Sequence, residues 1–185
     1  MRCTWCTDDA DYIAYHDGEW GRPVHDDRHL FELIILEGMQ AGLSWLTILK
    51  KRPAFRRALC DFEPERVAAF DENDVDRLMC DAGIIRSRRK ILAAIGNARA
   101  FLAIQNEYGS FDRYIWGFVG FKPIINRPAP GCAPASTPLA EKISRDLKAR
   151  GFRFAGATIV YSFMQSAGLV NDHDTQCFLC GEGEA

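Results

Sequence analysis

The segment from Leu30 to Leu49 is the most apolar stretch of the chain, and it limits the folds that the chain can adopt. Its apolar residues predict a helix, a break at Gly42 and a second helix. Ser44 follows the break and is a natural N-cap, because its hydroxyl can accept a hydrogen bond from an early free N–H of the second helix. The stretch therefore predicts two consecutive helices that contribute to the core.

Glu37 is the unusual residue of this segment, because Ile34–Leu36 and Met39 flank it. A helix there carries Glu37 close to the buried face, where an unpaired ionised carboxylate is strongly destabilising. In that case the group is neutral, paired or ready to bind a cationic ligand. The alternative places Glu37 on the solvated side of an amphipathic helix, as we expect for Glu32. The local pattern does not separate these two interpretations.

The composition is that of a water-soluble globular protein. The chain has 185 residues, 48% hydrophobic and 26% charged, which predicts one domain over residues 1–185 with a sizeable core. No apolar run is long enough to span a membrane, and residues 1–6 do not resemble a signal region. We therefore expect a cytoplasmic protein without membrane contact. The net charge of −2 means that any contact with nucleic acid depends on a local patch.

The helix signals continue through the middle of the chain, and the sequence reads as all-α without repeats. Asp71 followed by Asp74 predicts a capped helix. Gly83 is expected to end that helix as a left-handed cap, and Ser87 to cap the next. These two helices and their short connection, at about residues 72–102, predict a helical hairpin.

Basic residues crowd the start of the second helix of that hairpin: Arg86, Arg88, Arg89 and Lys90. The helix dipole disfavours cations at this end. A cluster of cations beside free N–H groups suits a phosphate, although a solvated basic face remains the alternative.

Five of the eight prolines lie in residues 122–138, which predicts a loop rather than a core element. Thr137 and Pro138 then start a helix, and a last helix is expected from about Ala157 to Gly168.

Two C-x2-C pairs lie near the two ends of the chain: Cys3 with Cys6, and Cys177 with Cys180. Four thiolates with this spacing suit zinc, and His16 and His173 are alternative ligands. Seven cysteines without an export signal favour thiols, with or without a metal, over disulfides. The sequence offers more ligands than a tetrahedral site needs, and unligated thiols are the other interpretation.

Several long blocks of the chain resemble the DNA-3-methyladenine glycosylase I family, the bacterial base-excision enzymes built around a helix-hairpin-helix. The blocks are residues 12–21, 36–45, 81–86, 150–152, 161–165 and 170–173. The resemblance implies an all-α helix-hairpin-helix DNA glycosylase fold, with structural Zn2+ pairing the two ends of the chain, residues 1–20 and 170–180. The zinc ligands that it implies are Cys3, His16, His173 and Cys177.

The resemblance also implies a pocket for a base that is rotated out of the duplex. Glu37 is expected to be the catalytic residue, recognising the adenine edge by hydrogen bonds. The base-binding aromatic residues are expected to be Trp5, Tyr12, Tyr15, Trp20 and Trp45. Leu43 resembles the residue that fills the gap in the base stack. The other implied DNA-binding residues are Gly83, Ile84, Arg86, Arg88 and Lys90.

The implied activity is hydrolysis of the N-glycosidic bond of 3-methyladenine in alkylated double-stranded DNA. Between Arg99 and Gly109 the only acid is Glu107, so we expect a monofunctional enzyme without a Schiff base or strand cleavage. The expected product is free 3-methyladenine, released by a monomer that associates with the nucleoid during repair. The alternatives are a non-catalytic protein that binds alkylation damage and a zinc-binding scaffold.

Overall fold

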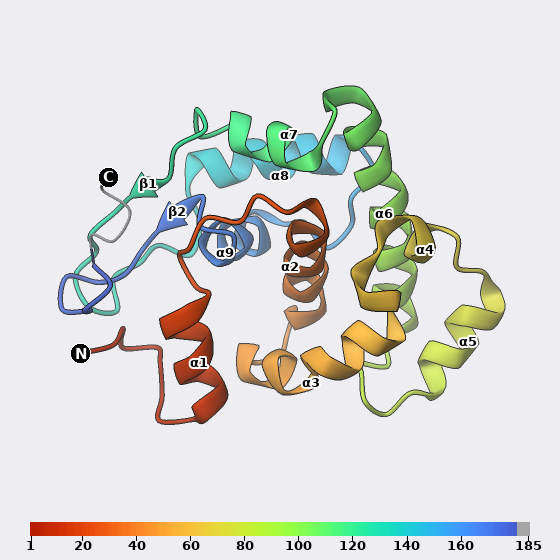
Figure 1. The fold of residues 1–185 in the computed structure, drawn as a ribbon, viewed down its shortest axis with the longest axis horizontal. Helices are drawn as coiled ribbons and strands as arrows, with labels where there is room; N and C mark the ends of the chain where they lie inside the picture. Colours follow the sequence, from red (N-terminus) through yellow and green to blue (C-terminus); the bar gives the residue numbers. More distant parts are fainter. Residues whose placement is uncertain (181–185) are drawn as a thin grey trace.

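The computed structural model describes residues 1–180 and is mainly helical (Figure 1). Residues 181–185 of the predicted single domain lie outside the described part. The helices, in chain order, are α1 (Ala10–Gly18), α2 (Asp27–Gln40), α3 (Trp45–Ala58), the 3-10 helix η1 (Cys60–Phe62), α4 (Pro64–Ala68), α5 (Glu72–Cys80), α6 (Arg88–Tyr108), α7 (Phe111–Gly117), α8 (Pro138–Ala149) and α9 (Ala157–Ser166).

Helix α2 lies in the centre of the molecule and is buried along most of its length (Figure 1). Asp26 caps its first turn by accepting a hydrogen bond from the His29 N–H at 2.8 Å. Helices α3, α6, α7 and α9 surround it, and its residues from Leu30 to Met39 are all buried. The burial of Glu37 at 3% exposure follows from this central position.

Our expectation that Glu32 lies on a solvated face was wrong. Its side chain is buried and accepts hydrogen bonds from Arg52 at 2.6 Å and Arg56 at 2.8 Å. Arg52 also donates to Glu19 at 2.6 Å, next to the end of α1. These ion pairs join α1, α2 and α3, and they compensate the burial of the charges.

The break between α2 and α3 forms as the sequence predicts. Gly42 has a φ of +79°, a left-handed conformation that glycine adopts without strain. The Ser44 hydroxyl accepts a hydrogen bond from the Thr47 N–H at 3.2 Å, which confirms Ser44 as the N-cap of α3. Leu43, between these two residues, is 41% exposed.

The turn between α5 and α6 differs from the prediction at Gly83. The capping box of Asp71 and Asp74 is present, but Gly83 does not have a positive φ and is not a left-handed cap. A Cβ at Gly83 would instead lie 2.9 Å from the Ala54 Cβ. Glycine is therefore required because the turn packs directly against α3. Ser87 occupies the N-cap position of α6, but its side chain makes no capping hydrogen bond.

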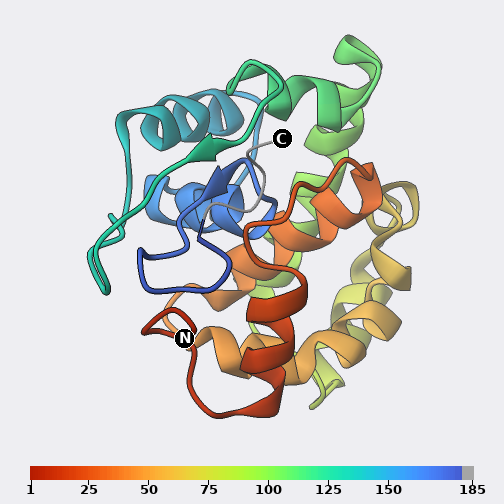
Figure 2. The same ribbon diagram turned by 60° about the vertical axis from the view of Figure 1, so that its left-hand side comes forward.

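Two short strands are the exception to the predicted all-α fold. β1 (Ile124–Ile125) and β2 (Val170–Asn171) pair in parallel, with Ile124 opposite Val170. Strands of two residues are too short to produce a readable alternation in the sequence. The two strands join the start of the proline-rich segment to residues 170–171, just before His173 (Figure 2).

Residues near both ends of the chain lie at the same side of the molecule (Figure 2). The Phe178 N–H donates to the carbonyl of Met1 at 2.9 Å. Among the described residues, no helix combines the length and the apolar character that a membrane crossing requires.

Candidate functional site

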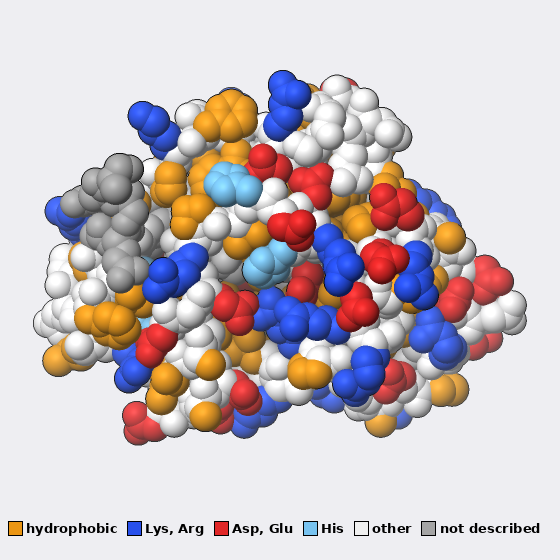
Figure 3. All heavy atoms as spheres, in the orientation of Figure 1, with side chains coloured by type: hydrophobic (Ala, Val, Ile, Leu, Met, Phe, Trp, Pro, Cys, Tyr) orange, Lys and Arg blue, Asp and Glu red, His pale blue; other side chains and the backbone are white. Residues whose placement is uncertain are grey.

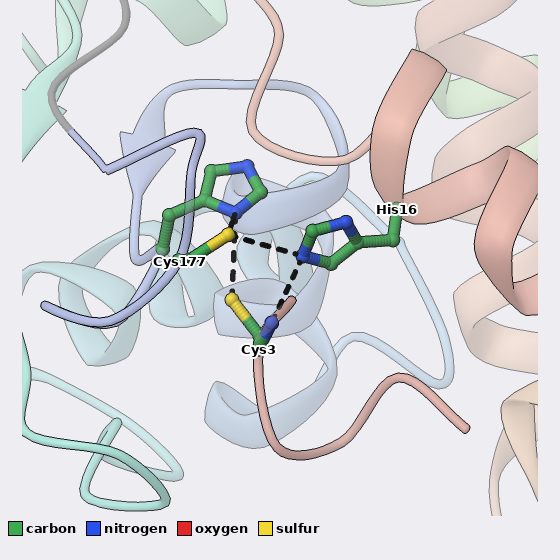
Figure 4. Close-up of side chains that lie close together, drawn as sticks. Cys3, His16 and Cys177 are labelled. Carbon is green, nitrogen blue, oxygen red and sulfur yellow. Dashed lines mark hydrogen bonds between the residues drawn. The ribbon is translucent and has the colours of Figure 1, made fainter. Parts of the chain in front are cut away.

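A buried cluster of two cysteines and two histidines joins the two ends of the chain: Cys3, His16, His173 and Cys177. Figure 4 shows Cys3, His16 and Cys177 converging from three separate segments. The Sγ of Cys177 lies 3.4 Å from His16 Nε2 and 3.4 Å from His173 Nδ1. The Sγ of Cys3 lies 3.4 Å from the same His173 nitrogen. The four residues are those that the family resemblance implies.

The geometry of the cluster fits a metal ion. Ligand atoms around a tetrahedral zinc ion are separated by about 3.3–3.8 Å, which agrees with the sulfur–nitrogen distances of the cluster. The far nitrogen of each histidine has an acceptor, as metal-bound histidines require. Asp17 Oδ1 lies 2.8 Å from His16 Nδ1, and the Trp20 carbonyl lies 3.2 Å from His173 Nε2. The cluster can therefore hold a metal ion, and its four protein ligands leave no open position.

The structure separates the alternative ligand sets that the cysteine spacing left open. Cys6 and Cys180 lie outside the cluster, although they belong to the two C-x2-C pairs. Burial raises the pKa of the Cys3 thiol to about 12 and lowers the pKa of His173 to about 4. A metal cation at this position would stabilise the charged thiolate that burial disfavours. The neutral imidazole that burial favours is the form of histidine that binds a metal.

A pocket of about 400 Å³ lies beside this cluster of two cysteines and two histidines, and Cys3 belongs to its lining. Every base-binding candidate of the sequence lines it together with Glu37: Trp5, Tyr12, Tyr15, Trp20 and Trp45. Helix α1 contributes the two tyrosines, α2 contributes Glu37, and the first residue of α3 is Trp45. The segment that carries Cys3 also carries Trp5. The elements that hold the cluster therefore also form one wall of the pocket.

The aromatic rings of the pocket support one another by edge contacts. The centroid of Trp5 lies 5.7 Å from that of Tyr12 and 4.9 Å from that of Trp20, at steep interplanar angles. Tyr15 lies 5.4 Å from Trp45. The Tyr12 hydroxyl accepts from the Leu46 N–H at 3.2 Å and so links α1 to the start of α3. This packing holds the rings in place around the cavity.

Burial in the pocket changes the charge state of Glu37 at neutral pH. Burial raises the pKa of its carboxyl group to about 8, although the nearby Ser166 hydroxyl opposes the shift. Its Oε2 is buried and has no hydrogen-bond partner within the described chain. Such an atom is costly unless a ligand satisfies it. The carboxyl group is thus suited to a ligand that offers a proton or a positive charge.

Two further unpartnered polar atoms belong to the same pocket. The indole Nε1 atoms of Trp5 and Trp45 are buried and have no acceptor among the described residues. The pocket therefore combines flat apolar walls with two free donors and one free carboxylate oxygen. This set suits a flat heterocycle that carries both donors and acceptors.

The sequence did not identify the opposite wall of the pocket. Tyr161 and Gln165 of α9 line it, together with Asp172. The Asp172 carboxylate accepts from the Tyr161 hydroxyl at 2.6 Å, from Gln165 Nε2 at 2.7 Å and from Asn126 Nδ2 at 2.8 Å. Tyr161, Gln165 and Asp172 lie in blocks that carry the family resemblance, which was the available signal, whereas Asn126 lies outside them. Residues of the proline-rich segment 122–138 also line the pocket, although we expected only a loop there.

The candidate DNA-contact residues lie in two connections, residues 41–44 and 81–87, and in the first turn of α6. Leu43 and Arg86 are exposed, whereas the Ile84 side chain is buried, so that only its backbone is available. Arg88 pairs with Glu72 and with Asp76. On the face drawn in Figure 3, basic and acidic side chains are interspersed. This face therefore carries no broad patch of basic side chains.

The ammonium group of Lys90, the last of these candidates, makes hydrogen bonds within the protein. Its ammonium group lies 2.8 Å from the carbonyl oxygens of both Met39 and Ala41. This contact differs from the phosphate contact that the sequence predicts for Lys90.

Comparison with known proteins supports the resemblance. A model of the methyladenine glycosylase family matches residues 5–180. DNA-3-methyladenine glycosylase 1 of Escherichia coli (strain K12) is 51% identical over 177 residues, which cover 95% of each chain.

Two solved structures have nearly the same fold. A crystal structure of 3-methyladenine DNA glycosylase I is 53% identical, with a TM-score of 0.94 and coverage of 96% of this chain and 98% of that one. A tyrosine-to-phenylalanine variant of 3-methyladenine DNA glycosylase I, in complex with 3-methyladenine, is 39% identical, with a TM-score of 0.95 and 98% coverage of both chains. With this coverage and identity, the chain belongs to the methyladenine glycosylase family.

Proposed function

We propose that this protein removes 3-methyladenine from alkylated double-stranded DNA by hydrolysing the N-glycosidic bond. The family membership and the relatives named DNA-3-methyladenine glycosylase support this activity. The observation that carries the proposal is the pocket itself, with the unpartnered Oε2 of Glu37 and two unpartnered indole N–H groups among aromatic walls.

The chemistry of the lesion matches the pocket. The base of an N3-methylated deoxyadenosine is a cation while it is attached to the sugar, so the leaving group is already activated. Flat aromatic walls such as Trp45 and Tyr15 stabilise a flat cation by stacking and cation–π attraction. The base must leave the duplex to reach them, because the glycosidic bond is inaccessible in the stack.

Glu37 has the central role in this mechanism. Its carboxyl group accepts a hydrogen bond from the edge of the base, and its negative charge compensates the positive charge of the lesion. Because the pKa of the free carboxyl group is about 8, binding of the cationic base releases a proton from Glu37 at neutral pH. As the bond breaks, the carboxylate stabilises the adjacent oxocarbenium-like sugar, which water then attacks.

The enzyme is proposed to be monofunctional. No lysine lines the pocket in the described part of the chain, so no amine is placed to form a Schiff base. Glu107, the only acid between Arg99 and Gly109, lies away from the pocket and pairs with Arg150 at 2.7 Å. The proposed products are the free base and an uncleaved abasic strand.

The connection between α5 and α6 is proposed to act as the helix-hairpin-helix that holds the phosphate backbone. The α6 N-terminus supports this role, because no Ser87 side-chain hydrogen bond caps its free N–H groups. Arg86 is exposed and has no ion-pair partner among the described residues. Gly83 and Ile84 offer backbone groups, and exposed Leu43 is proposed to fill the space that the flipped base leaves.

Zn2+ is the proposed metal of the cluster, where Cys3, His16, His173 and Cys177 would hold it. Two thiolates and two imidazoles suit zinc, and four protein ligands give it a structural rather than a catalytic function. We also propose that the enzyme acts as a monomer on chromosomal DNA in the cytoplasm, associated with the nucleoid during repair.

Chromatography of the bases released from methylated duplex DNA tests the proposal. We expect release of 3-methyladenine with the strand intact until alkali is added. Glu37→Gln is expected to lose the release, whereas Glu107→Gln, which changes an acid outside the pocket, is expected to retain it. Folded, metal-loaded protein that binds the methylated duplex but releases no base would instead establish a non-catalytic damage-binding protein.

A further inference from the structure

Two lysines cross between the connections that carry the DNA-contact candidates. Lys90 in the first turn of α6 donates to the carbonyls of Met39 and Ala41, both at 2.8 Å. Lys51 in α3 donates to the carbonyls of Ala82 at 3.0 Å and Gly83 at 3.1 Å. Each lysine thus lies in the helix that follows one connection and binds backbone carbonyl groups at the other: Lys51 in α3 binds the turn before α6, and Lys90 in α6 binds the end of α2.

The Lys90 contact replaces a helix cap that α2 lacks. The last turn of α2 contains no basic residue, and its C-cap residue Ala41 makes no capping hydrogen bond. The carbonyl groups at this end carry partial negative charge and need donors. Lys90 supplies donors from 49 and 51 residues away in the sequence. Lys90 therefore links the end of α2, and with it the start of residues 41–43, directly to the first turn of α6.

The remaining contacts of the loop at residues 41–44 are sparse. Gly42 has no heavy atom within 4 Å of the position of a Cβ, and Leu43 is 41% exposed. Ser44 fixes the far side of the loop to α3. Without Lys90, the tip that carries Leu43 is attached to the rest of the protein only through α2 and α3.

The connection at residues 81–87 is positioned from the other direction. Gly83 packs so closely on α3 that a Cβ would lie 2.9 Å from the Ala54 Cβ. Lys51, on the same helix, holds two consecutive carbonyl groups of this turn. Helix α3 thus fixes the turn, and α6 fixes the Leu43 loop.

We propose that Lys90 and Lys51 are positioning residues that set the distance between exposed Leu43 and the phosphate-binding turn of α5 and α6. This inference rests on the proposed function. A protein that holds the backbone at one connection and inserts a side chain from another needs a fixed spacing between them, since small displacements reduce the rate strongly. Two of the three N–H donors of each ammonium group already bind carbonyl oxygens, so we infer that each lysine acts through these backbone contacts rather than as a phosphate ligand.

The salt dependence of DNA binding distinguishes a positioning lysine from a phosphate ligand. The slope of log K against log salt concentration is negative, and loss of one phosphate contact makes it shallower by about one. We expect Lys90→Met and Lys51→Met to leave the slope unchanged, whereas Arg86→Met, the matched control, makes it shallower. A slope that becomes shallower by about one in Lys90→Met would overturn the proposal for Lys90.

Catalysis and loop mobility are measured on the same variants. We expect single-turnover excision at saturating duplex to fall about tenfold or more in Lys90→Met, with an unchanged affinity for free 3-methyladenine. Lys90→Arg, which retains several donors, is expected to restore the rate. Unchanged excision in Lys90→Met and Lys51→Met would contradict the proposal, as would a loss of affinity for the free base.

Hydrogen exchange tests the contacts without any reference to activity. We expect faster exchange at residues 41–43 in Lys90→Met and at residues 82–86 in Lys51→Met, with little change elsewhere. Unchanged exchange in both would overturn the proposal even if excision fell. If the wild-type protein released no base, the proposed function would fail, while the exchange data would still decide whether the lysines hold the two connections.

Discussion

The carboxyl group of Glu37 and the indole ring of Trp45 line the same pocket, and each has a buried polar atom without a partner in the described chain. One atom is an acceptor and the other is a donor. Unpaired buried polar atoms destabilise the free protein, and a ligand that satisfies both gains that energy on binding. The free pocket is therefore organised for a base rather than for its own stability.

The pH dependence of excision follows from the state of Glu37. The pKa of about 8 means that most of the free enzyme carries a neutral carboxyl group at pH 7, whereas the cationic base requires the carboxylate. We expect kcat/KM to rise about tenfold per pH unit below this pKa and to level off above it. Glu37→Gln should be slower by about a hundredfold or more and should lose the rise. A flat wild-type profile between pH 6 and 8, measured as released 3-methyladenine, would contradict this assignment.

The same group makes a testable contribution to stability. Its pKa is higher in the folded than in the unfolded chain, so the folded protein binds more protons between about pH 4.5 and 8. The stability contributed by Glu37 is therefore fully present below pH 4.5 and is lost as the pH rises to 8. We expect the Tm of Glu37→Gln to exceed the wild-type Tm by at least about 2 °C at pH 8. Thermal denaturation of both proteins at pH 5 and 8 would show no such divergence if the carboxyl group were paired.

Metal removal is expected to loosen the site as well as the fold. We expect about one equivalent of zinc per chain, and a chelator should lower the Tm and the affinity for free 3-methyladenine together, because Cys3 and Trp5 share one short segment. Cys177→Ser should reproduce both losses. Cys6→Ser and Cys180→Ser, outside the cluster, are the controls and should retain the metal. Full zinc content in Cys177→Ser would refute the ligand set.

The buried Arg52 is expected to be far more important for stability than an exposed arginine. Arg52→Met removes one of the two arginines that pair with buried Glu32 and leaves half-buried Glu19 without its 2.6 Å partner, and we expect a loss of about 3 kcal/mol in the free energy of unfolding. Arg66→Met removes an exposed pair with Glu63 and should change it by less than about 0.5 kcal/mol. Urea denaturation measures the free energy of unfolding of both variants. Equal losses would show that the buried ion pairs stabilise the protein no more than the exposed pair does.

Two glycines of the hairpin region should respond to alanine in opposite directions. Gly83→Ala places a Cβ 2.9 Å from the Ala54 Cβ and should destabilise the protein by about 1–3 kcal/mol. Gly96 lies inside α6 with open space around it, so Gly96→Ala should stabilise the protein by up to about 1 kcal/mol. Denaturation of the two variants gives the comparison, and a neutral Gly83→Ala would mean that the turn can move away from α3.

The helix boundaries were predictable wherever the signal is local. Ser44, Asp71 and Thr137 cap their helices within three residues of their own positions, so the sequence alone specifies them. Gly83 was predicted to be a left-handed helix cap, and that prediction was wrong; glycine is required there for a different reason. Its requirement comes from Ala54, a residue of another helix, and no pattern near Gly83 contains that information.

The candidate site was predictable to the extent that its residues carry the family resemblance. Burial of Glu37 could not be separated from exposure until α2 was placed at the centre of the fold. The same helix buries Glu32, whose partners Arg52 and Arg56 are 20 and 24 residues away. For Lys90, charge and position favoured phosphate, whereas its actual partners are carbonyl groups about 50 residues away in the sequence. Partners distant in the sequence decided each of these cases.

The cluster of Cys3, His16, His173 and Cys177 also bears on when the protein can become active during its synthesis. Cys3 and His173 are 170 residues apart, and a ribosome adds about 5–20 residues per second, so on the order of ten to thirty seconds pass between them. During that interval the aromatic wall that includes Trp5 and Tyr15 has no opposite wall, because Tyr161, Gln165 and Asp172 come late in the chain. A nascent chain therefore cannot capture a damaged base until the segment that carries Asp172 and His173 has been synthesised.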